Sequence, residues 1–511
     1  MERTETSQTI AGMEKDLSSE FNYGLKEVAI ILAAGHGKRI KSQRSKMLHK
    51  IWEVPTVERV YEACAQGIKG LNTIVVVGIM AKDVMRVLGK RANSVFALQE
   101  EQKGTGHAVQ AALAKINPQR FDGIVYVLPG DMGLLNKETI EAFRAAFLES
   151  DADMMVLTGM YEGDPEQNSY GRIIRVKETD ASGRPSRDDA GRVIKILEHK
   201  DILALPDDRP YAVTYRERVF EYSKRELIEK REFNSGVYAF RFKELMSVIY
   251  ELTSDNAQNE IYITDLIALF NAHGYTVDAV SPREQYVLMG FNNKSVLREM
   301  EKIAREKVYE MLKDIVEIDD PEDFFIDESV VDQIVELDGE GIPLDVRIGK
   351  GVHIGKGTQV NYNLTLKKNV FVQGNVRFGK NVTVGENVLL SCFPHQVFSI
   401  DDDVEILSGD IVKGNIEIGC KARIESSVNM TGSDEYPLRI GKNVLIKGTS
   451  YIFGSIIEDD VFIEHSVIIK KHVSRRLKRD GTIQPVRFYL PMPEGIDSVE
   501  SLQGAGPSAE H

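Results

Sequence analysis

The sequence has few cysteines, no long apolar run and no excess of basic residues. Its three cysteines, Cys64, Cys392 and Cys420, are scattered and share no metal-ligand spacing, which argues against a disulfide framework and suits a reducing compartment. No apolar run approaches the roughly 18–20 residues that a membrane span needs. The net charge of −14 argues against a general nucleic-acid binder, because such proteins are usually basic. These absences predict a cytoplasmic, soluble protein with no membrane span and no nucleic-acid partner.

Two common phosphate-binding motifs are also missing. The P-loop pattern G-x-x-x-x-G-K-[ST] is absent, and Gly35 and Gly37 do not fit G-x-G-x-x-G because the third residue after Gly37 is Ile40. These glycines still follow an apolar run and precede Arg39 and Lys46. Glycines let the backbone approach a ligand closely, and N–H groups in such a turn attract phosphate. An ordinary strand-to-helix turn explains two glycines about as well, so the interpretation depends on other segments.

The first half of the chain alternates strand-like and helix-like segments. Residues 1–25 are polar, lack an apolar signal-peptide segment and predict a loosely attached extension. Residues 26–294 predict an α/β domain with a Rossmann-like, mixed and mostly parallel sheet. Ligands of such sheets bind at the carboxyl ends of the strands. The expected strands are Val28–Ala33, Thr73–Val77, Val95–Leu98, Ile124–Leu128, Met154–Leu157, Ile173–Val176, Val193–Leu197, Val237–Phe240 and Thr276–Val280, and the expected helices include Thr56–Cys64 and Thr105–Lys115.

The second half follows a different pattern. Residues 295–320 contain a linker helix with apolar residues at spacings of three and four. Residues 321–473 carry a six-residue repeat, in which apolar or small residues recur from Val346 to Val388 and again two positions later. This period predicts a left-handed parallel β-helix of hexapeptide repeats.

Two interruptions and a polar tail accompany the repeat. We interpret the breaks at about residues 392–410 and 429–440 as insertions that form surface loops. Residues 474–511 begin with basic side chains and end rich in Pro, Gly, Ser and Glu. Such a composition predicts a disordered tail.

Polar side chains follow several of the expected strands. Gln99 precedes Gly104 and Thr105, and its amide can donate to and accept from a base edge. Thr105 could equally cap a helix. Asp131 ends a strand, where a carboxylate can hold Mg²⁺, although a turn or N-cap Asp is commoner.

A second set of polar groups lies further along the chain. Gly171, Glu198 and Asn234 stand at strand edges, where they could hydrogen-bond a sugar, although turn chemistry explains each one alone. Asn292 precedes the long helix and could cap it or reach a metal. His107 and His199 fit no metal-ligand spacing and carry no catalytic assignment.

Taken in order, these segments resemble the bacterial bifunctional UDP-N-acetylglucosamine pyrophosphorylase / glucosamine-1-phosphate N-acetyltransferase family, a family with a nucleotidyltransferase domain. The resemblance spans nearly all of residues 27–293. The matching pieces are Leu32-Ala-Ala-Gly35-x-Gly37-x-Arg39, Lys46-x-Leu48-His49, Gln99 with Gly104-Thr105-Gly106-His107-Ala108, Gly130-Asp131, Tyr170-Gly171-Arg172-Ile173, Glu198-His199-Lys200-Asp201, Asn234-x-Gly236, Asp255 to Asp265 and Gly290-x-Asn292-Asn293.

The resemblance implies roles for individual residues. Arg39, Lys46 and Asp131 would be catalytic, and Asp131 and Asn292 would bind Mg²⁺. The implied reaction joins UTP and N-acetylglucosamine-1-phosphate into UDP-N-acetylglucosamine and pyrophosphate, a step of nucleotide-sugar biosynthesis for cell wall precursors. It needs no general base, since the attacking phosphate oxygen is already an anion. The implied contacts with nucleotide and sugar fall on Leu32, Ala33, Ala34, Gly35, Gly37, Lys46, Gln99, Gly104, Thr105, Pro129, Gly130, Gly171, Glu198, Asn234 and Asn292.

The chain departs from the family pattern at several positions. Lys38 replaces a threonine in the glycine loop, Ser45 replaces a proline, and Pro129 replaces an aromatic residue in the nucleotide-sugar pocket. The acetyltransferase signatures Gly-His-Leu-Thr-Tyr and Asn-Tyr-Asp-Gly are not found. We therefore expect no acetyl transfer, and expect the β-helix to serve assembly, with a homotrimer implied by related families, or regulation.

Three alternatives stay open at this point. A pyrophosphorylase for another sugar-1-phosphate or nucleotide would differ at Gln99, Pro129 and Asn234. Acyl-CoA transfer on the β-helix would need one of His353, His395, His465 or His472, which we interpret as surface or turn residues. A non-enzymatic sensor or scaffold would have lost Lys46, Asp131 or Asn292, yet all three are present.

Overall fold

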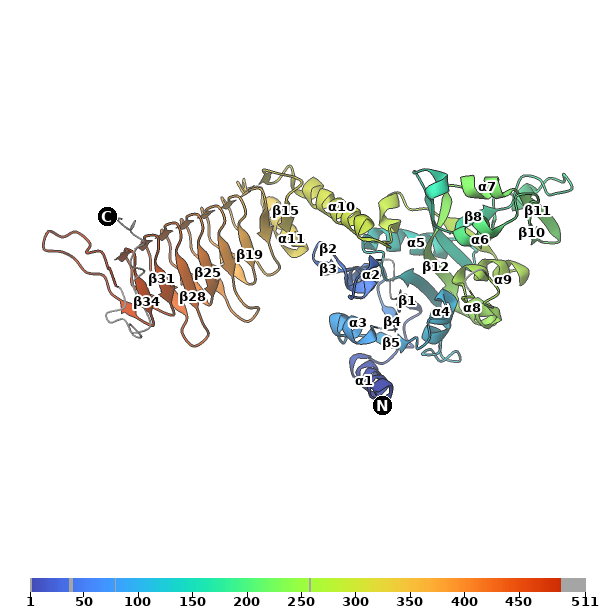
Figure 1. Cartoon of the computed structure of the whole chain (residues 1–511), viewed down its shortest axis with the longest axis horizontal. Coiled ribbons are helices and arrows are strands. Elements are labelled where there is room, and N and C mark those ends of the chain that lie inside the picture. Colours follow the sequence, from blue (N-terminus) through green and yellow to red (C-terminus); the bar gives the residue numbers. More distant parts are fainter. Residues whose placement is uncertain (1, 36–39, 79, 257–258, 489–511) are drawn as a thin grey trace, which may run out of the picture. The chain divides into compact units, whose positions relative to one another are not determined.

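The structure is a computed structural model that describes residues 2–35, 40–78, 80–256 and 259–488. The chain divides into two compact units, Met1–Glu301 and Lys302–His511. The first unit combines a sheet with helices, and the second consists mainly of stacked parallel strands (Figure 1).

A nine-stranded sheet forms the centre of the first unit. Its main path runs in the order β13-β7-β12-β6-β1-β4-β5, and β8 and β9 extend it beside β12. Along this path β12 alone is antiparallel to its neighbours, so the sheet is mixed and mostly parallel, as predicted. The strands are β1 (Glu27–Ala33), β4 (Leu71–Val77), β5 (Ser94–Leu98), β6 (Ile124–Pro129), β7 (Met154–Met160), β8 (Arg172–Arg175), β9 (Val193–Leu197), β12 (Glu232–Arg241) and β13 (Val277–Val280).

Helices cover both faces of this sheet because the side chains of each strand alternate between the faces. On β1, Ala29 and Ile31 face the core under α2, α3 and α5, whereas Val28 and Ile30 face the core under α4, α8 and α9. The helices are α1 (Glu2–Leu17), α2 (Thr56–Gly67), α3 (Ala81–Leu88), α4 (Thr105–Leu113), α5 (Lys137–Glu149), α6 (His199–Ala204), α7 (Lys224–Glu229), α8 (Phe242–Val248), α9 (Leu266–Ala272) and α10 (Lys294–Leu312).

Shorter elements complete the first unit. A hairpin packs with β8 and β9 around a separate small core that includes Ile174, Phe220 and Tyr222. The short strands are β2 (Lys50–Ile51), β3 (Val54–Pro55), β10 (Tyr211–Tyr215) and β11 (Arg218–Tyr222), and the 3-10 turns are η2 (Lys46–Leu48), η3 (Pro165–Gln167), η4 (Arg187–Asp189), η5 (Ile249–Glu251), η6 (Ile263–Asp265) and η7 (Gln285–Leu288).

The N-terminal extension differs from the expectation of loose attachment. It contains α1, and Ile10, Met13 and Leu17 pack against the core of the sheet. The N–H of Phe96 donates to Ser18 Oγ at 3.0 Å, and the N–H of Ser19 donates to the carbonyl of Ser94 at 2.8 Å. An apolar stripe at spacings of three and four therefore binds this segment to the edge strand β5.

The second unit is a parallel β-helix with three sheets. Two sheets take one strand from each of eight coils, in the orders β14-β16-β18-β21-β24-β27-β30-β33 and β15-β17-β19-β22-β25-β28-β31-β34. The third sheet begins with the third coil and has the order β20-β23-β26-β29-β32-β35. One column of inward side chains is fully buried, and its members are Ile348, Leu366, Val384, Ile406, Ile424, Ile446 and Ile463. This stacking confirms the β-helix that the hexapeptide period predicts.

The strands of the β-helix are short, and one helix interrupts the first coil. That helix is α11 (Glu328–Asp338). The strands are β14 (Glu317–Ile318), β15 (Phe324–Ile326), β16 (Arg347–Ile348), β17 (Val352–Ile354), β18 (Thr365–Leu366), β19 (Phe371–Gln373), β20 (Val376–Phe378), β21 (Thr383–Val384), β22 (Leu389–Ser391), β23 (Phe398–Ile400), β24 (Glu405–Ile406), β25 (Ile411–Gly414), β26 (Ile416–Ile418), β27 (Arg423–Ile424), β28 (Asn429–Gly432), β29 (Leu438–Ile440), β30 (Leu445–Ile446), β31 (Tyr451–Phe453), β32 (Ile456–Ile457), β33 (Phe462–Ile463), β34 (Val467–Ile469) and β35 (His472–Val473).

Asparagines form the corners between these strands. Asn363 and Asn381 have φ of 55° and 58°, a left-handed conformation that Asn tolerates better than most residues. Asn363 Nδ2 donates to Asn381 Oδ1 at 3.0 Å, and Asn381 Nδ2 donates to Asp403 Oδ1 at 2.9 Å. Each corner is therefore hydrogen-bonded to the next coil, which explains why polar turn residues recur in the repeat.

The interruptions of the repeat are smaller than expected. Phe371 pairs with Leu389, an advance of 18 residues, whereas Leu389 pairs with Ile411 and Asn429 with Tyr451, advances of 22 residues each. Each break thus adds four residues to one coil, and the coils on both sides continue in register. The additions lie in the turns that follow β22 and β28.

The β-helix also extends beyond the predicted bounds of 321–473. At its start, β14 and β15 already pair with β16 and β17. At its end, Leu477 and Ile483 form an antiparallel bridge, and Val486 pairs with Ile463. Within residues 474–488, Val486 thus pairs with the last coil, whereas Leu477 and Ile483 pair with each other. Residues 489–511 lie outside the part of the chain that the structure describes.

Candidate functional site

Lys46, Asp131 and Asn292 meet at the carboxyl end of the central strands. Lys46 Nζ forms an ion pair with Asp131 and donates to Asn292 Oδ1 at 3.0 Å. The side chains of Lys46 and Asp131 are only 11% and 14% exposed. Their charges are screened little at such burial, so the contact is strong and specific in geometry.

Small residues hold Asp131 in this place. It follows β6, and the N–H of the preceding Gly130 donates to the carbonyl of Leu32 on β1 at 3.0 Å. A Cβ at Gly290 would lie 3.2 Å from Asp131 Oδ2. A side chain at that position would therefore press on the carboxylate, which explains the glycine two residues before Asn292.

The glycine-rich turn begins where it was expected, after β1. Leu32 and Ala33 end this strand, and Ala34 and Gly35 follow it. Among the described residues, a Cβ at Gly35 would meet Met47 Cε at 3.9 Å, an ordinary van der Waals contact. The proposed contacts at Gly37 and Arg39, together with the departure at Lys38, lie outside the described residues.

Gln99, Gly104 and Thr105 lie in residues 99–106, which we call the nucleotide loop after the role that the resemblance implies for them. Gln99 Nε2 donates to the carbonyl of Gly104 at 3.0 Å and lies 3.2 Å from His107 Nδ1. When His107 Nδ1 accepts, both N–H groups of the Gln99 amide are used and its oxygen is left as an acceptor. Such an oxygen matches a base that presents an N–H on its pairing edge.

Thr105 does not cap α4, contrary to the alternative considered from sequence. The N-cap residue is Gly104, and Thr105 Oγ1 instead accepts from the N–H of Ile263 at 3.1 Å. Because that contact uses the oxygen as an acceptor, the hydroxyl proton of Thr105 is left to donate.

Gly171, Glu198 and Asn234 form a second group beside β8 and β12. The N–H of Asn234 donates to the carbonyl of Gly171 at 2.9 Å. A Cβ at Gly171 would lie 3.2 Å from Glu198 Oε1, so the glycine leaves room for the carboxylate. Asn234 Nδ2 donates to Tyr238 Oη at 2.7 Å, which fixes the amide. These polar groups offer donors and acceptors of the kind that sugar hydroxyls require.

Burial changes the protonation of Glu198. Desolvation, followed by the nearby carboxylates of Asp201 and Asp265, raises its pKa to about 7, while a hydrogen bond from Thr264 lowers it. Glu198 thus passes between its neutral and charged forms near neutral pH. A group with this property within a polar cluster is typical of a functional site.

Two residues that were quoted only as part of a matching motif support the site. The ring of Tyr170 stacks on Phe233 at 4.5 Å, and its pKa is raised by burial and by Asp131. Arg172 is fully buried and donates to the carbonyls of Tyr170, Asn168 and Pro165. Tyr170 thus lies between the Asp131 group and the Gly171 group, a position that sequence spacing did not reveal.

Pro129 ends β6 between the two groups. It pairs with Leu32 of β1, and a Cβ at Gly236 would lie 2.9 Å from Pro129 Cγ. Gly236 has φ of +87°, which favours glycine. The proline ring therefore takes the space that a side chain at Gly236 would need.

The histidines of the β-helix are separated from one another. His353 stacks between Phe325 and Phe371, at 4.5 and 4.3 Å. His395 pairs with Asp434 at 2.9 Å, and both side chains are more than half exposed. His465 and His472 lie on later coils.

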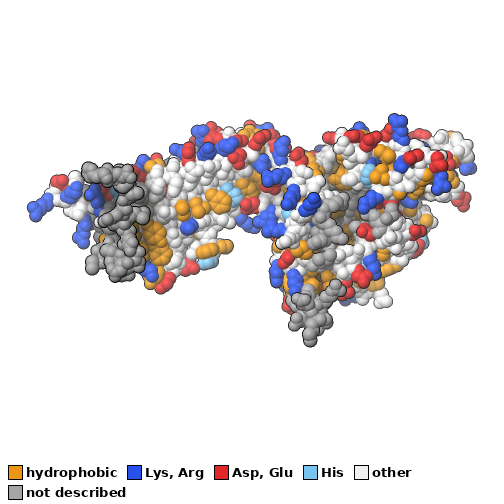
Figure 2. Space-filling view, viewed as in Figure 1, with side chains coloured by type: hydrophobic (Ala, Val, Ile, Leu, Met, Phe, Trp, Pro, Cys, Tyr) orange, Lys and Arg blue, Asp and Glu red, His pale blue; other side chains and the backbone are white. Residues whose placement is uncertain are grey.

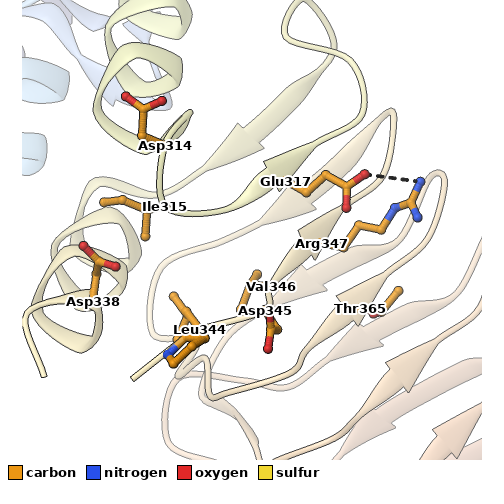
Figure 3. A pocket seen from close by; sticks show the side chains of 10 residues that line it. Asp314, Ile315, Glu317, Asp338, Leu344, Asp345, Val346, Arg347 and Thr365 are labelled. Atoms are coloured by element: carbon orange, nitrogen blue, oxygen red, sulfur yellow. Dashed lines mark ion pairs between the residues drawn. The ribbon is translucent and has the colours of Figure 1, made fainter. Parts of the chain in front are cut away.

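A pocket of about 480 Å³ lies at the first coil of the β-helix (Figure 3). Arg347 in its lining pairs with Glu317 at 3.7 Å and with Asp319 at 3.1 Å. Its other lining residues are Asp314, Ile315, Asp338, Pro343, Leu344, Asp345, Val346 and Thr365, and no site residue predicted from sequence is among them.

The described residues contain neither a cluster of metal-ligating side chains nor a membrane-spanning helix. No group of three or more His, Cys, Asp or Glu side chains that could hold a metal occurs in the described ranges. Every helix there is too short or too polar to cross a bilayer.

Comparisons with known proteins bear on the family of the chain and on the class of its first unit. Residues 29–221 match the family model of the MobA-like NTP transferase domain. The chain is 35% identical over 304 residues to the Bifunctional protein GlmU of Carboxydothermus hydrogenoformans, covering 59% of this chain and 58% of that protein. It is 32% identical over 305 residues to the protein of the same name from Acetivibrio thermocellus, covering 59% and 57%.

A solved structure was also found. The crystal structure of UDP-glucose pyrophosphorylase complexed with UDP-glucose aligns with a TM-score of 0.38 and 14% identity, covering 55% of this chain and 100% of that chain. The chain spans a little over half the length of the curated relatives that it matches. Those relatives confirm the resemblance stated from the motifs, and the family model identifies a nucleotidyltransferase domain in the first unit.

Proposed function

We propose that the chain is a Mg²⁺-dependent uridylyltransferase that makes UDP-N-acetylglucosamine and pyrophosphate from UTP and N-acetylglucosamine-1-phosphate in the cytoplasm. The observation that carries the proposal is the meeting of Lys46, Asp131 and Asn292 at the carboxyl ends of β1 and β6. In sheets of this kind that edge is where ligands bind. The GlmU relatives and the transferase domain support the reaction class.

The donor groups fit a magnesium ion. Asp131 and Asn292 offer a carboxylate and an amide oxygen, the hard ligands that Mg²⁺ prefers, and both now contact one cation, the Lys46 ammonium. Few protein ligands are needed because substrate phosphates complete the coordination. When bound there, Mg²⁺ would neutralise and orient the phosphates of UTP.

The remaining residues would position the substrates. Lys46 would neutralise charge on the triphosphate, and Gln99 would accept from the N–H of the uracil edge. Glu198 would accept from sugar hydroxyls, beside the amide of Asn234. Positioning and charge neutralisation supply most of the catalysis in such transfers.

A pyrophosphate-release assay tests this proposal. The purified chain is given Mg²⁺ and UTP with either N-acetylglucosamine-1-phosphate or glucose-1-phosphate. We expect strong preference for the first sugar. Preference for glucose-1-phosphate, or activity with neither sugar, would contradict the proposed substrate and require a wider panel of sugar phosphates and nucleotides.

We propose that the β-helix assembles the chain into a homotrimer rather than transferring acetyl groups. One of the two outward columns of the β15–β34 sheet is mostly apolar, and Figure 2 displays apolar side chains on the β-helix. The other two sheets carry ion pairs outward, such as Arg423 with Glu405 and Arg439 with Glu417. The column comprises Phe325, His353, Phe371, Leu389, Ile411, Asn429, Tyr451 and Val467.

Molar mass in solution tests the assembly. Ile411 is 38% exposed and Tyr451 40% exposed, so replacing both with Lys places charges on the apolar column. We expect the double variant to be monomeric by light scattering, and Thr383→Lys on the ion-paired β14–β33 sheet to keep the mass of the wild type. A monomeric wild-type chain would contradict the homotrimer.

A further inference from the structure

Residues 261–264 contact the nucleotide loop through their backbone. The N–H of Ile261 donates to the carbonyl of Lys103 at 2.7 Å, and the carbonyl of Ile261 accepts from the N–H of Gly106 at 2.8 Å. Two residues later, the N–H of Ile263 donates to Thr105 Oγ1 at 3.1 Å. The loop is therefore hydrogen-bonded to this segment on both sides of Gly104.

The contact is too close to be incidental. A Cβ at Gly104 would lie 2.5 Å from the carbonyl oxygen of Ile261, and one at Gly106 would lie 2.8 Å from Ile261 Cγ2. Gly104 also has φ of +108°, a conformation that L side chains rarely adopt. Both glycines of the loop are thus explained by the segment that packs on them and not only by a ligand.

The same segment reaches the sugar side of the site. Thr264 is 5% exposed, and its hydroxyl lies close enough to the Glu198 carboxylate to lower the pKa of Glu198 by hydrogen bonding. The turn η6, which contains Thr264, packs on both α4 and β9, the elements that carry Thr105 and lead to Glu198. Residues 261–264 therefore extend from the nucleotide loop to the carboxylate of Glu198.

We propose that residues 261–264 are a positioning segment that fixes the nucleotide loop and Glu198 together, so that the nucleotide and sugar sites are coupled. The proposal rests on the proposed function, because it gives a role to the segment between the two substrate sites. Neither Thr264 nor Ile261 is assigned to a substrate contact, and each acts through another residue. Coupling of this kind is reciprocal, so a change on either side is felt on the other.

Titration of Glu198 supplies a readout that separates loss of the hydroxyl from loss of packing, because loss of burial alone would lower the pKa of Glu198. The groups that face this carboxylate are Asp201, Asp265 and Tyr238, besides Thr264. Asp201 and Asp265 raise the pKa of Glu198, and the Thr264 hydroxyl lowers it. Loss of the hydroxyl must therefore move the titration of Glu198 to higher pH.

The first experiment measures the affinity for N-acetylglucosamine-1-phosphate between pH 5.5 and 8.5 by calorimetry. We expect Thr264→Val to weaken binding about tenfold at pH 7 and to move the pH midpoint upward, since a hydrogen bond to a charged group is lost. Thr264→Ser, which keeps the hydroxyl, should have the affinity and the pH midpoint of the wild type. Thr73→Val, at another buried threonine of the sheet, should leave both unchanged.

The coupling itself is tested from the nucleotide side. Thr105→Val removes the acceptor of the Ile263 N–H, and we expect it to move the same pH midpoint in the same direction, by less than Thr264→Val. A Thr105→Val variant with the wild-type midpoint would overturn the proposal. So would a Thr264→Val variant that binds the sugar phosphate as the wild type does.

Hydrogen exchange without any substrate separates this proposal from the proposed function. We expect Thr105→Val to speed exchange in peptides that cover residues 259–266, with wild-type exchange elsewhere. Faster exchange together with no sugar-phosphate binding in the wild type would keep the positioning segment and contradict the proposed substrate. Unchanged exchange would overturn the positioning segment, whatever the wild-type enzyme binds.

Discussion

The two units of this chain use polar residues in opposite ways. In the first unit, Lys46, Asp131 and Asn292 come from distant parts of the sequence and meet in a mostly buried cluster. In the β-helix, polar residues such as Asn363 and Asn381 bond to their counterparts on the next coil. A sheet with long connections brings unlike residues together, whereas a solenoid stacks like on like. The proposed catalytic residues therefore lie in the first unit, and the repeated structure forms the second unit.

Removing the carboxylate of Asp131 should have the largest effect on activity. We expect Asp131→Ala to lower uridylyl transfer about a thousandfold, because the residue offers the charged oxygen ligand of the proposed Mg²⁺ site. Folding should be unchanged, as measured by circular dichroism. Turnover close to that of the wild type would remove Asp131 from the catalytic centre.

A carboxylate buried in the β-helix should affect stability and not catalysis. Asp410 is fully buried where neighbouring coils have Val388 and Val428, and burial raises its pKa to about 7. The folded state therefore prefers the protonated form, so the contribution of Asp410 to stability is greatest below about pH 4 and is lost as the pH rises through about 7. The loss for this group is on the order of 2–4 kcal/mol.

The variant Asp410→Asn isolates that effect. Its amide oxygen can still accept from the N–H of Val428, as the carboxylate does at 2.7 Å, but it does not titrate. We expect chemical denaturation of the variant to lack the wild-type slope between pH 4 and 7, with transfer activity unchanged at pH 7.5. The same pH slope in both proteins would show that Asp410 does not titrate in this range.

Replacing Glu198 should weaken the binding of the sugar phosphate more than the binding of UTP. We expect Glu198→Gln to lower the affinity for N-acetylglucosamine-1-phosphate about tenfold above pH 7, because a charged acceptor is lost. Since the pKa of Glu198 is raised to about 7, wild-type binding should strengthen as the pH rises through 7, and binding by the variant should be independent of pH. Calorimetry with UTP is the control, and its affinity should change by much less than tenfold, since UTP is coupled to Glu198 only indirectly.

The smallest effect is expected at the exposed ion pair of the β-helix. His395 and Asp434 join the two four-residue additions. We expect His395→Ala to change uridylyl transfer by less than about twofold, because surface substitutions rarely matter far from a site. A large loss would contradict the division of roles between the units.

Much of the fold could be predicted from local patterns. Strands β1, β4 and β6 were located to within one or two residues of their ends, because apolar runs bounded by turn residues mark buried strands. The period of six likewise predicted the first buried positions of the stacked column, Ile348, Leu366 and Val384. The packing of the N-terminal extension was not predicted, because its apolar stripe of Ile10, Met13 and Leu17 lies within a mostly polar segment.

The site was predicted less completely. Lys46, Asp131 and Asn292 were named through family resemblance, and the structure brings them together. The roles of Tyr170 and Thr264 were not found, because neither spacing nor composition indicates which residue packs between two loops. Their only signal was membership of the matching segments.

The sequence by itself determined the two architectures, since hydrophobic periodicity is a local property that each segment carries without its partners. It also determined which side chains were available to bind phosphate, a metal ion and a sugar. Only the tertiary structure decided that Ile261 would occupy the space beside Gly104 and that Thr264 would reach Glu198. Such contacts depend on how separate segments pack, and the burial that raises the pKa of Glu198 exists only once they have done so.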